Sequence, residues 1–385
     1  LFPSLSFSTS QQVVNRPYQE TSSRVSGSEI ISSNSKTSYN GNYGLNASWT
    51  IYNGSKRLKT LKQERLNNQV AELDVATSEN TIKESIAQIY IQILYAAESV
   101  RVNENTLQVS IAQRDRGQEL LNAGSIAKSD FAQLEAQVST DRYQLVTAQA
   151  TLQDYKLQLK QLLELDGENE MNVYLPKLSD ENVLAPLPAK KDVYVSALAI
   201  RPEIEASKLN VEASELGIDI AKSSYFPTIS LSAGIGTNHT SGSDFTFGEQ
   251  VKNGWNNSIG LSVSVPIFNN RQTKSAVQKA KLQRETNMLS LLDEQKALYK
   301  TIESLWLDAN SAQQRYAAAN EKLRSTQISY DLISEQFNLG MKNTVELLTE
   351  KNNLLQAQQE QLQAKYMAIL NTQLLKFYQG DKLTL

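Results

Sequence analysis

The chain has no cysteine and one histidine among its 385 residues. Without cysteine it cannot form a disulfide, a thiolate nucleophile or a cysteine-ligated metal centre. Zinc sites usually need three or four ligands, which one histidine does not supply. His239 lies in a stretch rich in glycine and serine, so we expect it in a loop, and we expect no metal and no cofactor.

Long apolar runs and a strong net charge are also missing. No run of about 18 apolar residues occurs, which argues against a transmembrane helix but leaves open a membrane β-barrel, whose strands give a weak alternating pattern. The formal net charge is -3 and no dense basic cluster occurs, so nucleic acid is not an expected partner. The chain starts at Leu1 without a leader, and we expect a signal peptide to have been removed or left out.

What is present is one unit in two copies. Matching residues recur at a constant offset of 216 positions: Glu119 and Glu335, Asn122 and Asn338, Gly124 and Gly340, Asn53 and Asn269, and Tyr90 and Trp306. The Phe2-Pro3 pair recurs as Phe226-Pro227 at an offset of 224. A helical stretch precedes the second pair, so we expect an equivalent helix before Phe2, within roughly 30 to 60 further residues of the natural protein.

Each unit opens with apolar residues that alternate with small polar ones. This period of two predicts strands with one apolar and one polar face. We expect four strands in two hairpins, around Leu5 and Phe7 and around residues 45–51, 229–235 and 259–267. Aromatic residues lie near the strand ends, either as the girdle of a membrane barrel or as packing within the hairpins: Tyr39, Tyr43, Trp49, Tyr52, Phe226, Trp255 and Phe268.

Two very long helices follow the strands. Apolar residues from Leu298 to Phe337 step by four and three, and those from Ile82 onward do the same, with weaker positions at Asn103 and Ser110. A period of about 3.5 residues predicts left-handed coiled coils. Each helix would be about 100 Å long at ~1.5 Å per residue, well beyond a bilayer core of ~30 Å.

Both helices stop at a glycine. Residues 121–128 read LNAGSIAK and residues 337–344 read FNLGMKNT. Gly124 and Gly340 fit the position after a helix end, where a left-handed backbone is needed. Asn343 and Glu346 have the spacing of a capping box that begins the next helix. We therefore predict two antiparallel helical hairpins with exposed tips.

These patterns divide the chain into six segments: a first membrane β-hairpin (1–53), a first long helical hairpin (54–165), a connector (166–192), a helix (193–225), a second membrane β-hairpin (226–269), and a second long helical hairpin with the C-terminal tail (270–385). Four strands cannot close a barrel, because about eight are needed and lipid does not tolerate open edges. Several chains must therefore share a barrel. Two would give eight strands around a filled interior, and three would give twelve and begin to leave a lumen.

A resemblance to a known family rests on three features: the doubled architecture, the Phe-Pro strand starts, and the tip patterns Asn122-Ala123-Gly124-Ser125 and Asn338-Leu339-Gly340-Met341. With them the chain resembles the TolC-like outer-membrane efflux proteins over essentially its whole length. The resemblance implies a homotrimer, with a twelve-stranded barrel in the outer membrane of a Gram-negative bacterium and a helical barrel across the periplasm. It also implies an exit duct for drugs, metals or proteins that docks on a periplasmic adaptor fed by an inner-membrane transporter.

The resemblance implies roles for residues at the tips. Asp130 corresponds to the acidic partner of a link that closes the aperture, Lys342 to its basic partner, and Glu346 to a constriction acid. Phe337 stands where a hydroxyl-bearing aromatic is usual and Thr349 where a second acid is found, so the hydrogen-bonded closure is expected to be weaker or replaced. The adaptor is expected to dock on Ala123, Gly124, Ser125, Leu339, Gly340 and Met341.

Simpler readings remain open. Asp130 and Glu346 fall in first helical turns, where a carboxylate is stabilised by ~0.3 to 1 kcal/mol without any gating role. Lys342 would then be an exposed residue of a solvated turn, and its ion pair would contribute at most ~1 kcal/mol to stability. A periplasmic adaptor would have one such hairpin, whereas this chain has two. A coiled-coil scaffold would explain the heptad pattern but not the four strands. An enzyme is not expected, because there is no glycine-rich phosphate loop and no cleft-building alternation of strands and helices.

Overall fold

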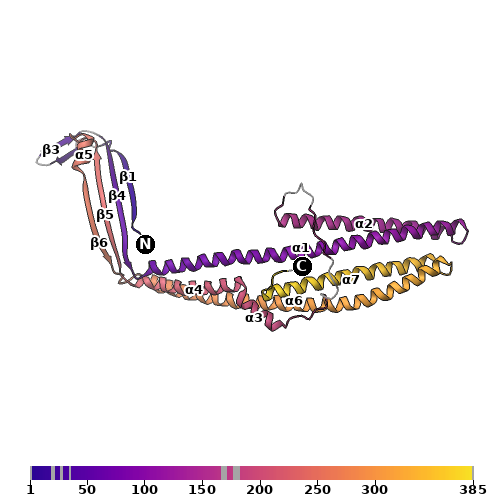
Figure 1. Ribbon diagram of the computed structural model, residues 1–385. Coiled ribbons are helices and arrows are strands. Elements are labelled where there is room, and N and C mark those ends of the chain that lie inside the picture. The colour runs from indigo at the N-terminus through magenta and orange to yellow at the C-terminus, as the bar shows by residue number, and fades with distance from the viewer. Residues whose placement is uncertain are drawn as a thin grey trace. The chain divides into compact units, whose positions relative to one another are not determined.

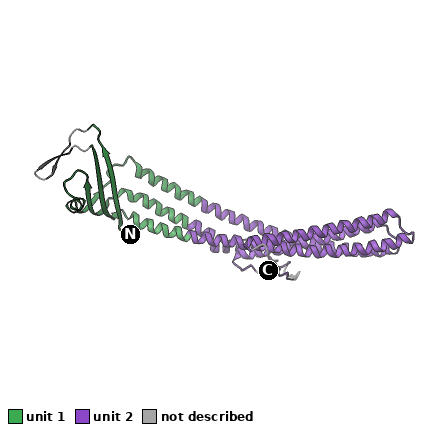
Figure 2. Cartoon of the chain, turned by 90° about the horizontal axis from the view of Figure 1, so that it is seen from above, with its two compact units in different colours: residues 1–69, 209–289 green, residues 70–208, 290–385 purple. Residues whose placement is uncertain are grey.

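The computed structural model describes residues 2–18, 22–26, 29–33, 36–165, 171–176 and 183–383. The chain divides into two compact units (Figure 2). The first comprises Leu1–Gln69 and Leu209–Leu289 and contains the strands, and the second comprises Val70–Lys208 and Ser290–Leu385 and contains both hairpin tips.

The first unit contains a four-stranded antiparallel sheet in the order β1-β4-β5-β6 (Figure 1). The strands are β1 (Ser4–Asn15), β4 (Thr37–Asn53), β5 (Thr228–Thr240) and β6 (Asn256–Ser264), which confirms the four predicted strands. β6 ends before Pro266, short of the predicted Ile267, because proline has no N–H for the ladder. A further pair, β2 (Ser22–Ser26) with β3 (Glu29–Ser33), interrupts the first hairpin and is not foreseen by the alternating pattern.

The two faces of this sheet differ in chemistry. Residues paired across neighbouring strands point to the same face, and successive residues of a strand alternate. One row across the sheet is apolar, formed by Leu5, Ala47, Ala233 and Ile259. The adjacent row is small and polar, formed by Ser6, Asn46, Gly234 and Ser258. The apolar face is exposed, with Ile259 at 84% and Leu261 at 66% accessibility.

Each sheet hairpin passes into a long helix through two residues with left-handed backbone. Gly54 and Ser55 both have φ of 64° and precede α1 (Lys56–Asn122). Asn270 and Arg271 have φ of 51° and 62° and precede α6 (Gln272–Asn338). Both helices have 67 residues, and the two junctions are again 216 positions apart, so the structure repeats as the sequence does.

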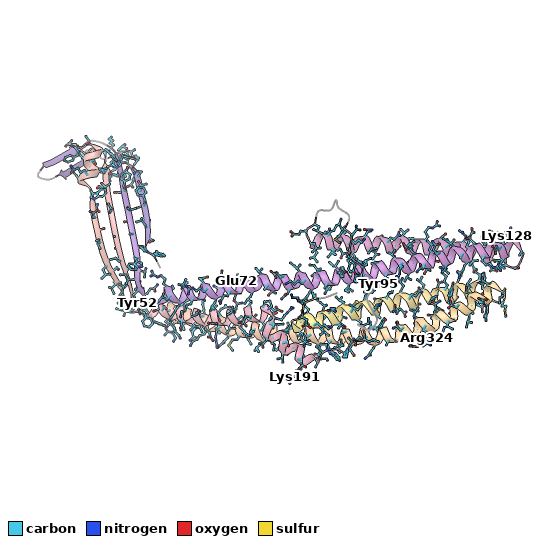
Figure 3. All side chains as sticks on the ribbon, in the orientation of Figure 1. Tyr52, Glu72, Tyr95, Lys128, Lys191 and Arg324 are labelled. Atoms are coloured by element: carbon cyan, nitrogen blue, oxygen red, sulfur yellow. The ribbon has the colours of Figure 1, made fainter. Side chains whose placement is uncertain are left out.

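The second unit is built from two helical hairpins, α1 with α2 (Lys128–Leu162) and α6 with α7 (Thr344–Gln379). Buried residues of α1, α6 and α7 form one apolar cluster, at whose edge the ring of Tyr95, labelled in Figure 3, lies 6.3 Å from that of Tyr366. Helix α3 (Lys190–Ile200) packs through Val193 and Ala197 on α6 and α7. Among the described residues, no helix combines the length and apolar character needed to cross a membrane.

The helix predicted for residues 193–225 is interrupted. Helix α3 begins earlier, at Lys190, and is followed by α4 (Pro202–Lys222) and a 3-10 turn at Ser223–Tyr225. Arg201 is extended, with φ -74° and ψ 125°, because a residue before proline is kept out of the helical region. Of the predicted connector, residues 171–176 are irregular, and residues 166–170 and 177–182 lie outside the described part of the chain.

The prediction that His239 lies in a loop is wrong, because this residue lies in strand β5. Its ring stacks on Tyr43 with 5.8 Å between centroids and meets Phe247, at the start of α5 (Phe247–Asn253), at 5.1 Å. A side chain at Gly41 would collide with the His239 ring, so this glycine makes room for it. Tyr43 of β4 therefore packs on aromatic rings of the second hairpin, and not within its own hairpin.

Candidate functional site at the helical tips

The two tips follow the same local rules. Gly124 and Gly340 come after the ends of α1 and α6, with φ of 74° and 73°. A Cβ on either would meet nothing within 4 Å, so glycine is needed for its backbone conformation and not for space. The N–H group that follows each glycine donates to the last helical turn at 2.8 Å, from Ser125 to the Leu120 carbonyl and from Met341 to the Gln336 carbonyl. The predicted helix ends are confirmed.

The second tip returns through the predicted capping box. Asn343 Oδ1 accepts from the Glu346 N–H at 2.8 Å, and the Glu346 carboxylate accepts from the Asn343 N–H at 3.2 Å. Lys342 Nζ donates to the same carboxylate at 2.6 Å. The Lys342 ammonium and the Asn343 N–H together lower the pKa of Glu346.

Asp130 occupies the matching position at the start of α2. Its carboxylate accepts from the Ala127 N–H at 3.3 Å and so caps the helix. Within one chain, Asp130 thus contacts its own hairpin, and Lys342 contacts Glu346 rather than Asp130. A link between Asp130 and Lys342 stays a prediction.

Phe337 lies in a small core that joins the two hairpins below their tips. It is 2% accessible and packs with Leu134 of α2 and Leu347 of α7. Phe337 therefore holds the hairpins together by burial. A tyrosine hydroxyl is present two turns earlier, where Tyr330 accepts a hydrogen bond from Gln113 of α1 at 2.9 Å.

The exposed surfaces of the two tips differ. The first tip presents small residues, Ala123, Gly124 and Ser125. The second presents large apolar side chains, with Leu339 67%, Met341 71% and Val345 57% accessible. Lys128, labelled in Figure 3, begins α2 beside the first tip. Clustered exposed apolar side chains are typical of an interaction surface, so the second tip is the more apolar candidate for contact with a partner.

Sequence reasoning misses one charged cluster near the tips. Lys351 of α7, Asp141 of α2 and Ser110 of α1 are only 3%, 2% and 2% accessible. The Lys351 ammonium contacts Asp141 Oδ2 and the Ser110 hydroxyl, and that hydroxyl donates to Asp141. Gln137 donates to Asp141 Oδ1 at 2.9 Å. Burial lowers the pKa of Lys351, and the Asp141 carboxylate opposes this shift. The one available signal was the weak seam position at Ser110.

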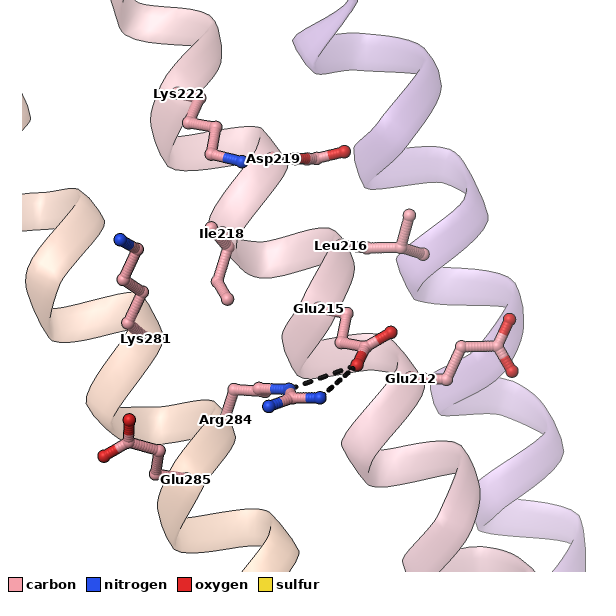
Figure 4. A pocket seen from close by; sticks show the side chains of 9 residues that line it. All are labelled: Glu212, Glu215, Leu216, Ile218, Asp219, Lys222, Lys281, Arg284 and Glu285. Atoms are coloured by element: carbon pink, nitrogen blue, oxygen red, sulfur yellow. Dashed lines mark hydrogen bonds and ion pairs between the residues drawn. The ribbon is translucent and has the colours of Figure 1, made fainter.

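The first unit has a charged groove of about 600 Å³ between α4 and α6 (Figure 4). Glu215 accepts two hydrogen bonds from Arg284, at 2.8 and 3.1 Å, and Asp219 contacts Lys222 at 3.3 Å and Lys59 at 3.6 Å. The pairs of Arg284 and Lys59 join neighbouring helices, whereas Asp219 and Lys222 pair within α4, and each exposed pair contributes at most ~1 kcal/mol. They support packing and do not point to a ligand.

A comparison with known families decides the identity. The family described as "Outer membrane efflux protein" matches residues 1–164 and 193–380. The chain belongs to the outer membrane efflux protein family. Membership confirms the resemblance drawn from the sequence, places the chain in the outer membrane and sets aside the adaptor and scaffold alternatives. Because efflux proteins transport rather than catalyse, it also confirms that the chain is not an enzyme.

Relatives of this efflux protein are distant. Outer membrane efflux protein BepC of Brucella suis biovar 1 (strain 1330) is 26% identical over 294 residues, which are 76% of this chain and 61% of BepC. Outer membrane protein TolC of Escherichia coli (strain K12) is 24% identical over 341 residues, which are 85% of this chain and 66% of TolC. The chain thus spans less than two thirds of the length of either relative.

A solved structure shares the fold of this efflux protein. The crystal structure of CusC superposes with a TM-score of 0.80 at 19% identity, covering 99% of this chain and 84% of CusC. The predicted fold class, strand pairs joined to very long helical hairpins in tandem repeat, is therefore confirmed.

Proposed function

We propose that this chain is the channel-tunnel of a tripartite efflux or type I secretion system, a passive exit duct gated at its periplasmic tips. The main support for this proposal is the sheet, which has an exposed apolar face and a small polar face. Its two outer edges, on β1 and β6, are not covered by any other described strand. The names of similar proteins agree with this, since BepC is named an efflux protein and the CusC structure is described in terms of transmembrane channel formation.

A homotrimer would complete this sheet. In lipid, an open strand edge leaves N–H and C=O groups without partners, at several kcal/mol for each group. β6 of one chain can pair antiparallel with β1 of the next, because directions alternate along the strand order. Three copies would then form a twelve-stranded barrel, with Leu5 and Ile259 toward lipid and Ser6 and Gly234 toward a water-filled lumen.

The long helices would continue this duct into the periplasm. A helix of 67 residues is about 100 Å long at ~1.5 Å per residue. The exposed tips would dock on a periplasmic adaptor, which an inner-membrane transporter supplies with small molecules or proteins. Leu339 and Met341 would provide apolar anchors, while Gly124 and Gly340 would let a partner helix approach closely.

The gate is proposed at the second tip. In a trimer, three copies of Glu346 near the axis would create a field that favours cations. Lys342 holds this carboxylate at 2.6 Å, so opening would change that contact. Asp130 is the proposed further partner of Lys342 when chains assemble, and Phe337 keeps the hairpins packed around the aperture.

Single-channel conductance in planar bilayers tests this function. The full-length protein, purified in detergent, is expected to insert as a trimer with a small cation-selective current. Lys342→Ala should raise the current and Glu346→Ala should reduce cation selectivity. Lys296→Ala is the matched control, because Lys296 is exposed on α6 and pairs only loosely with Asp293, at 3.8 Å.

The possible results distinguish the proposal of a duct from the proposal of a gate at the second tip. A purified trimer that never inserts or conducts would overturn the duct. Insertion with the same current and selectivity in all variants would keep the duct and remove the gate from the second tip.

A further inference from the structure

The contact between α1 and α7 changes character along its length. α1 contributes Ile91 and Leu94 to a large apolar cluster with α6 and α7. Nearer the tips, its buried residues include the polar Ser99, Asn103 and Ser110. Ser99 Oγ, for example, donates to Gln359 Oε1 of α7 at 3.2 Å. Polar groups therefore hold the hairpins together here, and such contacts can be exchanged for contacts with water.

The charged cluster lies in this polar stretch and spans three helices. Asp141 Oδ2 accepts from Lys351 and Ser110, and Asp141 Oδ1 accepts from Gln137. Because both carboxylate oxygens have partners and the charges neutralise each other, the cluster is stable while it is closed. Removing one member of a buried pair leaves an uncompensated charge, which is strongly unfavourable in a dry site.

Two clefts lie along the helices that carry the cluster, and the smaller one reaches Lys351. One of about 280 Å³ is lined by Ser99, Asn103 and Gln144 among others, and one of about 190 Å³ is lined by Tyr330 and by Lys351 itself. A water molecule occupies about 30 Å³ in the liquid, so each cleft has room for several. A small separation of α7 from α1 would therefore bring water onto the charges.

The cluster occurs once per chain. At the repeat offset of 216, Lys351 corresponds to Glu135 and Asp141 corresponds to Ala357. The second hairpin thus supplies the cation and the first hairpin the anion, with no reciprocal pair at the equivalent positions.

We propose that Lys351, Asp141 and Ser110 form a latch that holds α7 of the second hairpin against α1 and α2 of the first and is released by hydration from the flanking clefts. The three are positioning residues, which act on the tips through the helices that carry them. The inference rests on the proposed function, since a latch of this kind matters only in a duct that opens and closes. With the latch released, the core around Phe337 and the hydrogen bond from Gln113 to Tyr330 would still join the hairpins near the tips.

The test is bilayer conductance of the full-length trimer with variants of the cluster. Asp141→Asn and Lys351→Met should each raise the open-channel current on the order of tenfold, because an unpaired buried charge is relieved by opening. The double variant Lys351→Met with Asp141→Leu should restore the closed state, because no buried charge remains. Gln359→Ala, which removes a neutral contact between the same helices, is the control and should change the current less than about threefold.

Ser110→Ala tests the latch if the charge variants do not yield trimers. It removes one hydroxyl and should raise the current about two- to tenfold. Unchanged current in Ser110→Ala, or in both single charge variants, would overturn the latch. So would a double variant as open as the single ones. A wild-type trimer without any current would instead overturn the proposed duct, so the two failures are distinguishable.

Discussion

At the residue scale, the Glu346 carboxylate makes two kinds of contact at once. Its carboxylate accepts from the Asn343 N–H as a helix cap and from Lys342 as an ion-pair partner. A change to alanine would therefore remove the cap together with the charge. Glu346→Gln is the cleaner variant, because glutamine keeps the capping geometry while losing the charge.

The lowered pKa of Glu346 predicts how the tip responds to acid. Its folded pKa lies below the ordinary glutamate value of about 4.3, so its stabilising effect is complete above that pH and is lost as pH falls through the folded pKa. Carbon-13 NMR of labelled glutamate carboxyls, assigned with Glu346→Gln, should give a midpoint below that of free glutamate. Lys342→Ala should move the midpoint upward. A wild-type midpoint at the ordinary value would contradict the ion pair and cap.

At the element scale, the junction from strand to helix recurs in both repeats. Both junctions place two successive residues in the left-handed region, which favours glycine. Only the first copy has a glycine there, Gly54, whereas the second has Asn270 and Arg271. Gly54 is also crowded, since a Cβ would lie 2.7 Å from the Ser223 carbonyl oxygen.

These junctions predict opposite effects of two substitutions. Gly54→Ala should destabilise the protein by about 1 to 3 kcal/mol through backbone strain and crowding. Arg271→Gly should be neutral or stabilise it by up to about 1 kcal/mol by relieving a left-handed non-glycine residue. Thermal unfolding followed by circular dichroism would measure both. Gly248→Ala is the control, because a Cβ there meets nothing within 4 Å. Equal melting temperatures for Gly54→Ala and Gly248→Ala would refute the argument.

At the scale of the whole molecule, the proposed trimer makes the sheet of each chain part of an interface between copies. Its outer strands, β1 and β6, pair on one side with β4 and β5, and their other edges need partners in lipid. The interface between copies should therefore consist of main-chain hydrogen bonds, with side chains of both faces continuing their rows around the barrel.

The absence of cysteine makes this interface easy to test. Ser6→Cys combined with Ser258→Cys or Ser262→Cys should give covalent dimers and trimers on oxidation, because β1 of one chain would lie beside β6 of the next. Ser48→Cys with Ser258→Cys is the control, since β4 is already paired on both sides. A trimer that no β1–β6 pair can cross-link would contradict the shared barrel.

Several features of this protein follow from sequence alone because their causes are local. The repeat, the ends of the 67-residue helices, the left-handed glycines Gly124 and Gly340 and the Asn343 capping box each depend on residues within a turn or on a fixed period. Strand alternation likewise reports the two faces of the sheet. These patterns carried the family resemblance, which the family match confirmed.

Tertiary structure decided what depends on residues far apart in the chain. Lys351 and Asp141 are 210 positions apart, and each belongs to a helix whose outer face is polar, so sequence pattern cannot tell a buried charge from a solvated one. Phe337 is a core residue because Leu134 and Leu347 meet it from two other helices. His239 is a strand residue because Gly41 of the neighbouring strand leaves room for its ring. Helical periodicity predicts which residues are buried. The helix that covers them is determined only when the hairpins pack against each other.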